Sequence, residues 1–179
     1  MTTTSLAQRT APFMDHLEQW YRSLEPFHMA QEVRDPARAA VFSADMVVGF
    51  CSQGALASPR VRDLIPAVVN LFVRAHAHGV RHFILAQDTH SEDAPEFTSF
   101  PPHCVRGTEE SPTVPELRAL PFSSDFTVIE KDSLHPALGT DLDAWLGRHN
   151  ELRDLIVVGD CTDLCTYTMA MHLRLRASV

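Results

Sequence analysis

Four short apolar runs of the chain are each followed by residues that can carry chemistry. Apolar runs of this length, separated by helical patterns, are typical of the buried strands of a parallel sheet. The strands of such a sheet end at one edge, and ligands bind there. We therefore expect a carboxylate, a metal motif, the chain's only lysine and a thiol to meet at that edge: Asp45, Asp88, Lys131 and Cys165.

Each of these residues also has a structural explanation when it is taken alone. An Asp at a strand end often caps the next element, and cysteine is among the most buried and least reactive residue types. The joint placement at one predicted edge favours a functional site over these separate explanations. The lysine adds to this, because every other basic residue of the chain is arginine and only lysine offers a compact ammonium.

Cys165 occupies a position where a thiol would be reactive. We predict that Thr162 caps a helix over residues 163–176, which places Cys165 in the first turn. The free N–H groups and the helix dipole there lower the pKa of a thiol, and with the N–H of Cys161 they can hold an oxyanion. A redox or zinc pair of Cys161 and Cys165 ranks lower, because redox pairs are usually spaced C-x2-C and zinc needs further ligands nearby.

A second group of chemically active residues lies in the long polar segment after the second predicted strand. Imidazole and carboxylate groups in this mixture suit Zn, Mn or Fe(II) rather than Ca. The rigid Pro101–Pro102 pair directly before His103 can fix the direction of that side chain. A solvated acidic loop is the structural alternative. The predicted metal ligands are Asp88, His90, Glu96 and His103.

The composition restricts the class of protein. The chain has 179 residues, 45% of them hydrophobic, which fits one globular domain with a sizeable core. Its net charge of −8 disfavours nucleic-acid binding, which needs a basic surface. No apolar run approaches the roughly 18 residues of a membrane helix, and the N-terminus lacks a signal-peptide pattern. We therefore expect a cytoplasmic protein without a membrane partner, whose four cysteines are free thiols.

The apolar periodicity predicts an α/β protein. Strands that alternate with helices are typical of a three-layer α/β/α sandwich around a mostly parallel, Rossmann-like sheet. The predicted strands cover residues 39–45, 81–87, 126–130 and 155–159, and the predicted helices cover residues 61–78, 142–148 and 163–176, with a long irregular loop at 88–124.

The first 38 residues are expected to precede the main domain. Residues 1–10 are polar and are interpreted as a loose tail. Apolar residues at helical spacing predict an amphipathic helix over residues 12–24, whose apolar face docks on this subunit or on a neighbouring one. The predicted organisation is a tail and helix over residues 1–38 and one domain over residues 39–179.

Five motifs together resemble the isochorismatase-like cysteine hydrolases, and most closely the nicotinamidases among them. They are ADMVVGFC at 44–51, QDTHSEDAPEF at 87–97, FPPHCVRGT at 100–108, VIEKDS at 128–133 and VVGDCTDLC at 157–165. The combination is specific, and the motifs follow the order of the family over residues 39–176. The resemblance implies an isochorismatase-like fold and a catalytic triad of Asp45, Lys131 and Cys165.

The resemblance also implies the surroundings of this triad. The amides of Cys161 and Cys165 would form the oxyanion hole, after a cis peptide bond between Asp160 and Cys161. Phe50 and Phe100 would enclose the ring of the substrate. The four metal ligands named above would hold a divalent metal, with zinc first and Mn or Fe as alternatives. Family members are commonly dimers or tetramers, so we expect a homo-oligomer.

The predicted function is hydrolysis of a small carboxamide, with nicotinamide cleaved to nicotinate and ammonia through a thioester on Cys165. Asp45 would move the proton, and Lys131 would stabilise the charges of the carboxylate and the thiolate. Three alternatives stay open. The first is another substrate of the family, such as a ureido or carbamoyl compound or an isochorismate-like vinyl ether. The second is a hydrolase that activates water on the metal. The third is a non-catalytic thiol or metal-sensing module.

Departures from the family pattern concern the substrate more than the reaction. Val47, Val48 and Gly49 follow Asp45 where nicotinamidases often carry polar residues. Asp160 and Cys161 stand where small apolar residues are usual. Family members also usually add a strand and a helix after the nucleophile helix, so a truncation or a different completion of the sheet edge is expected here.

Overall fold

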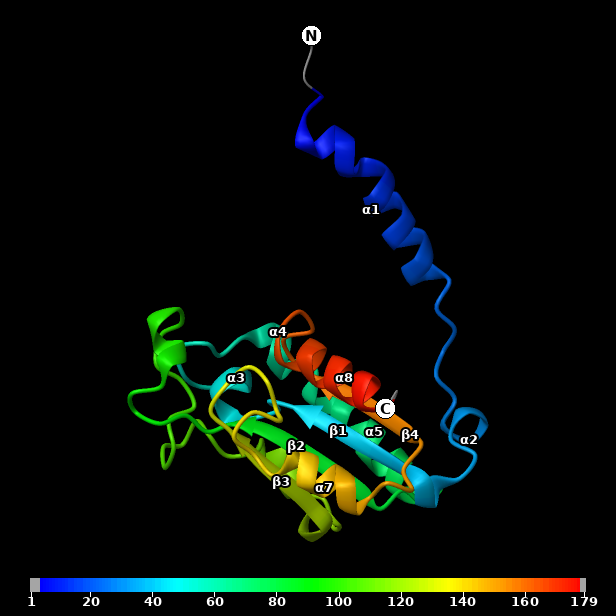
Figure 1. Cartoon of the computed structure of the whole chain (residues 1–179), viewed down its shortest axis with the longest axis vertical. Helices are drawn as coiled ribbons and strands as arrows, with labels where there is room; N and C mark the ends of the chain where they lie inside the picture. Colours follow the sequence, from blue (N-terminus) through cyan, green and yellow to red (C-terminus); the bar gives the residue numbers. More distant parts are fainter. Residues whose placement is uncertain (1–3, 178–179) are drawn as a thin grey trace. The chain divides into compact units, whose positions relative to one another are not determined.

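A computed structural model describes residues 4–177 of the chain. Contacts divide this part into two compact units, with the boundary between Glu32 and Val33. The first unit holds two helices, and the second holds a sheet with its helices (Figure 1).

The first unit contains α1 (Leu6–Arg22) and α2 (Met29–Glu32). The predicted helix over residues 12–24 is present, but it begins earlier because Ser5 caps α1 through a capping box. The loose tail predicted over residues 1–10 is therefore wrong from the start of α1, and residues 1–3 lie outside the described part. No residue of α1 is buried.

The second unit is built on a four-stranded parallel sheet with the order β3-β2-β1-β4. At its carboxyl edge Ala44 pairs with both Ala86 and Gly159, and Asp88 pairs with Lys131. All four strands therefore end side by side, as predicted for a parallel sheet. The strands are β1 (Ala39–Ala44), β2 (His82–Asp88), β3 (Phe126–Lys131) and β4 (Asp154–Gly159).

Helices cover both faces of the sheet, which confirms the predicted three-layer sandwich. On one face Phe42 of β1 packs edge-on against Trp145, and Met169 belongs to the same buried cluster. On the other face the rings of Phe72 and Phe83 lie 5.1 Å apart. The helices of this unit are α3 (Val48–Cys51), α4 (Pro59–Arg62), α5 (Ile65–His78), α6 (Pro115–Arg118), α7 (Leu142–Arg148) and α8 (Cys165–Arg176).

The single helix predicted over residues 61–78 is wrong at its start. Two helices, α4 and α5, take its place with a break at Asp63 and Leu64. Pro66 explains the break, because a proline lacks an N–H donor and is tolerated only in the first turn of a helix. The long loop over residues 88–124 is largely irregular, as expected, with short helical turns and α6 inside it.

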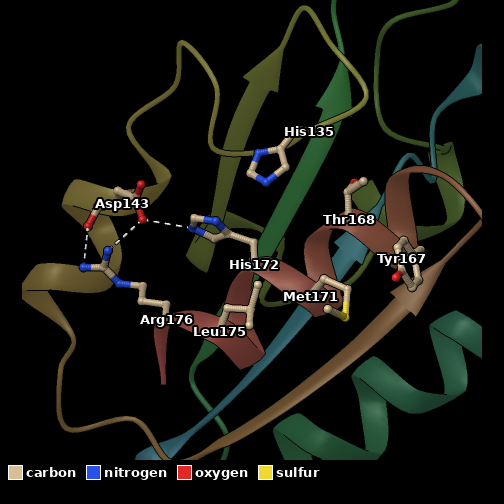
Figure 2. Close-up of a pocket in the computed structure, with 8 residues that line it drawn as sticks. All are labelled: His135, Asp143, Tyr167, Thr168, Met171, His172, Leu175 and Arg176. Carbon is tan, nitrogen blue, oxygen red and sulfur yellow. Dashed lines mark hydrogen bonds and ion pairs between the residues drawn. The ribbon is translucent and has the colours of Figure 1, made fainter. Parts of the chain in front are cut away.

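Asp143 of α7 contacts two residues of α8. Its carboxylate accepts a hydrogen bond from Arg176 at 2.8 Å and lies 3.0 Å from Nε2 of His172 (Figure 2). The side chains of Tyr167 and Met171 line the open hollow beside this contact. The buried Met169 and Leu173 pack α8 into the core cluster, and its first residue, Cys165, belongs to the same cluster.

Within residues 4–177, no helix is both long enough and apolar enough to cross a membrane.

Candidate active site

Asp45 lies directly after β1 and is fully buried. Its backbone is left-handed, with a φ of 55°, which asparagine and aspartate tolerate better than most residues. This turn ends the strand one residue before the predicted boundary. The Asp45 N–H donates to the carbonyl of Ala86, and its Oδ1 accepts the N–H of Asp88 at 2.8 Å. The carboxylate is therefore fixed by the neighbouring strand.

Lys131, the last residue of β3, joins the charged side chains of the site. Its ammonium lies 3.0 Å from Oδ2 of Asp45 and also donates a hydrogen bond to Asp88. Its Nζ is 3.6 Å from Sγ of Cys165. All these side chains are buried, and one cation thus contacts two carboxylates and a thiol.

The cysteine, Asp45 and Asp88 form a compact group around this ammonium. The Sγ of Cys165 and one carboxylate oxygen of each Asp all lie within 4.8 Å of one another. Three strand ends and the start of α8 supply these side chains. The structure therefore brings together the acid, the lysine and the thiol that the sequence places far apart.

The electrostatics of Cys165 differ from the expectation. Burial raises the pKa of the Cys165 thiol, and the neighbouring Asp45 raises it further, which Lys131 does not offset. The expected low pKa is therefore wrong for the resting site. The predicted cap by Thr162 is wrong as well, because residues 162–164 form a turn and α8 begins at Cys165 itself.

The pKa values of the two carboxylates that contact Lys131 are shifted in opposite directions. Burial raises the pKa of Asp45, although Lys131 partly offsets it. Burial would also raise the pKa of Asp88, but the neighbouring imidazoles of His103 and His90 and the charge of Lys131 hold it well below its usual range. Asp45 is thus the carboxylate of the pair with the greater tendency to accept a proton.

The loop before Cys165 turns through two residues with positive φ. Gly159 has a φ of 137° and Cys161 has a φ of 46°. The Asp160–Cys161 peptide bond is trans, so the cis bond implied by the family resemblance is wrong here. Among the described residues no acceptor is bonded to the N–H of Cys161 or Cys165. Both amides are therefore available to a ligand.

A second cluster lies beside the first and shares Asp88 with it. One ligand atom from each of its four residues lies within 4.8 Å of the others. Oδ2 of Asp88 is 3.4 Å from Nε2 of His90 and 3.7 Å from Nε2 of His103. The structure thus brings together all four predicted metal ligands: Asp88, His90, Glu96 and His103.

The outer nitrogens of both imidazoles are held by hydrogen bonds. Nδ1 of His90 lies 2.8 Å from Asp132, and Nδ1 of His103 donates to the carbonyl of Pro101 at 2.8 Å. Each Nε2 therefore faces the cluster with a lone pair, which is the usual arrangement of metal-bound histidines. Nε2 of His90 is buried without a hydrogen-bond partner among the described residues. This orphaned atom and the donor set fit a divalent transition metal.

Aromatic rings surround His103. The ring centre of Phe50 lies 5.4 Å from that of His103, and Phe100 lies 6.4 Å from it. Phe97 is also close, at 5.5 Å from His103 and 5.3 Å from His90. Flat apolar surfaces therefore border the metal cluster.

Three residues of the site were not singled out as functional from the sequence. Asp132 orients His90, and it could have been found as a second ionisable residue directly after a strand. Phe97 lies close to Glu96 in the metal motif, but nothing in its spacing marks it. Asp160 was noted only as a departure, yet it is 2% exposed and both its carboxylate oxygens lack a partner among the described residues. Burial and the charge of Asp45 raise its pKa to about 8.

The fold and the site define an α/β domain with a buried Asp–Lys–Cys group beside a metal-ligand set. The sequence matches the isochorismatase domain over residues 39–176. The chain therefore belongs to the isochorismatase family.

Known proteins resemble this chain in sequence and in fold. Nicotinamidase 1 of Arabidopsis thaliana is 32% identical over 139 residues, which cover 69% of this chain and 54% of that protein. The chain thus spans about half the length of this relative. N-carbamoylsarcosine amidase from Thermoplasma acidophilum has a TM-score of 0.68 at 25% identity, over 78% of this chain and 77% of that one. Pyrazinamidase of Pyrococcus horikoshii in complex with zinc has a TM-score of 0.65 at 25% identity, over 76% of this chain and 79% of that one.

Proposed function

We propose that this chain is a cysteine amidohydrolase that cleaves the C–N bond of a small carboxamide, with nicotinamide as the first candidate substrate. The observation that carries the proposal is the position of Lys131, whose buried ammonium lies 3.0 Å from Asp45 and 3.6 Å from Cys165. Family membership and the 32% identity to a plant nicotinamidase support the choice of an amide.

The first step of the proposed reaction moves a proton inside the site. Cys165 rests as a neutral thiol because its pKa is raised. Asp45, whose pKa is also raised by burial, takes the thiol proton as general base. Lys131 stays charged beside the new thiolate and offsets its negative charge. The thiolate then attacks the amide carbon.

The next steps use the free amides of the loop. The N–H groups of Cys161 and Cys165 stabilise the negative oxygen of the tetrahedral intermediate. Asp45 returns the proton to the leaving nitrogen, and ammonia departs from a thioester on Cys165. Asp45 then activates a water that hydrolyses the thioester and releases the acid.

We also propose that the cluster around Asp88 binds a divalent metal, with zinc as the first candidate. The zinc complex of a related pyrazinamidase supports this choice. When bound, the metal supplies an electron-pair acceptor that can orient a heteroatom of the substrate. The chain's own part is to hold the ring, for which Phe50 and Phe100 lie beside His103.

A carbamoyl compound is the second candidate substrate. The structural likeness to N-carbamoylsarcosine amidase favours it, since a carbamoyl group also presents a C–N bond to a thiolate. A vinyl ether like isochorismate is less favoured, because the proposed nucleophile Cys165 has no role in cleaving it.

Ammonia release from a panel of carboxamides and carbamoyl compounds tests the proposal. Cys165→Ala should lower turnover by about 10³-fold or more, because the covalent step is lost. The variant should keep the metal content and the melting temperature of the wild type. Cys51→Ala is the matched control, since Cys51 is also buried but lies in α3.

Two outcomes would contradict the covalent mechanism. One is a Cys165→Ala variant that still turns over the best substrate at the wild-type rate. The other is enzyme whose Cys165 is alkylated by iodoacetamide, as shown by mass spectrometry, without loss of activity. Loss of activity on chelation alone would then favour a hydrolase that activates water on the metal.

A further inference from the structure

A second group of metal-ligating side chains lies outside the site described above. It consists of His82 at the start of β2, His149 directly after α7, and Glu151 in the turn before β4. One ligand atom of each lies within 4.8 Å of the other two. His149 and Glu151 share the connection between α7 and β4, whereas His82 is distant from both in the sequence.

This group lies at the opposite end of the sheet from the active site. His82 begins β2, and Asp88 ends the same strand. At about 3.3 Å per residue the two ends are about 20 Å apart. A ligand bound here would therefore not touch the Asp–Lys–Cys group.

We propose that His82, His149 and Glu151 form a second site for a divalent transition metal, with zinc as the first candidate. Two imidazole nitrogens and one carboxylate are a donor set that zinc accepts, with water in the fourth position. Ligand atoms of tetrahedral zinc are about 3.3 Å apart, given bonds of about 2.0–2.1 Å. Nδ1 of His149 already lies 3.4 Å from Oε1 of Glu151.

The surroundings of the group suit metal binding. The ring of His149 packs on Trp145 at 4.2 Å, and the ring of His82 lies 4.8 Å from that of His149. These contacts hold both imidazoles in place. The side chain of Glu151 is exposed, so its carboxylate can move closer to the two imidazoles when a metal binds.

The position of the site gives the metal a structural role. It would join the end of α7 to the start of β2 and to the turn that leads into β4. A metal that binds only the folded chain stabilises it by RT ln(1 + [M]/Kd), where [M] is the free metal concentration. Zinc would thus anchor the amino edge of the sheet, remote from any catalytic metal.

Zinc binding to the full chain tests the proposal. The protein is stripped with a chelator, equilibrated with zinc by dialysis and analysed for bound zinc, and its melting temperature is followed against zinc concentration. The wild type should bind two equivalents, whereas His149→Ala and Glu151→Gln should each bind one, with the remaining zinc lost only when His90→Ala is added. His16→Ala is the matched control, because His16 lies on exposed α1.

Each outcome decides between two separate claims. The second site is overturned if His149→Ala and Glu151→Gln both bind as much zinc as the wild type, with unchanged affinity. In that case the contacts are only the ring packing of His149 on Trp145 and the ion pair of His149 with Glu151. If His90→Ala binds as much zinc as the wild type while Glu151→Gln loses it, the second site stands and the proposed metal site beside Asp88 fails. Glu151→Gln changes an exposed side chain, so its result does not depend on a variant that fails to fold.

Discussion

Lys131 is the residue on which the buried charges of the site depend. Burial alone would lower its pKa, but Asp45 and Asp88 outweigh this effect and raise it. The cation is held between two carboxylates that are themselves shielded from water. Removal of this cation should therefore lower the stability of the fold as well as the activity.

Lys131→Met should lower the free energy of unfolding by about 3–5 kcal/mol, because it leaves uncompensated buried carboxylates. Urea denaturation at pH 7 measures this. The matched control is Arg106→Met, which removes the exposed ion pair with Glu130 and should cost about 1 kcal/mol or less. Equal losses in the two variants would contradict the role assigned to the buried lysine.

Asp160 should make the protein less stable as the pH rises. Its pKa is 3.8 in the ordinary case and about 8 in the fold, so between these values the folded state binds more protons than the unfolded one. Stability then falls by up to about 1.4 kcal/mol per pH unit from pH 4 to pH 8, and no further above that. Asp160→Asn should lose this dependence. Parallel plots of unfolding free energy against pH for the two proteins would contradict it.

At the scale of elements, the carboxyl edge depends on a close approach of β1 and β4. Gly159 ends β4 with a φ of 137°, and a Cβ added there would overlap the backbone of Ala44. Only glycine fits such a position without a shift of the main chain. The loop that carries Cys161 and leads to Cys165 starts from this residue. A shift of Gly159 would therefore displace both cysteines of the site.

Gly159→Ala should therefore destabilise the protein by more than about 1 kcal/mol and lower the reactivity of Cys165. Differential scanning calorimetry and the rate of alkylation by iodoacetamide measure the two effects. Gly107→Ala is the matched control, because Gly107 has a positive φ but open space around it. A Gly159→Ala variant as stable as Gly107→Ala would show that β4 can move away from β1.

At the scale of the whole molecule, α1 belongs to the first unit of the chain, and none of its residues is buried. Its apolar side chains are exposed, and they include Phe13, Leu17, Trp20 and Tyr21. We expect this face to join subunits, because an exposed apolar stripe of this kind usually marks an interaction surface. The sequence already predicts such a docking face.

Leu17→Glu with Trp20→Glu should shift the protein to a smaller oligomer without a change in the melting temperature of the sandwich. Light scattering after size-exclusion chromatography measures the mass. Glu18→Lys, a charge change beside the stripe, is the control. A wild type that is already monomeric at micromolar concentration would rule out this role for α1.

The sequence by itself predicted the sandwich, because apolar runs and helical periodicity are local signals that repeat along the chain. It also predicted the family, and it named the four residues of the metal cluster, Asp88 among them. Local signals were weaker at element ends. The start of α8 and the break before α5 were misplaced, since a turn and a proline decided them.

Only the tertiary structure decided the electrostatics of the site. The dipole argument for Cys165 considered one helix, whereas the folded site buries the thiol next to Asp45, and both effects raise its pKa. Other features of the structure also depend on residues that are distant in the chain. Asp132 orients His90, and His82 meets His149 and Glu151. The backbone of Asp160 and Cys161 is likewise decided by the fold. Burial and long-range charge are properties of the packed molecule, and no local pattern of residue types contains them.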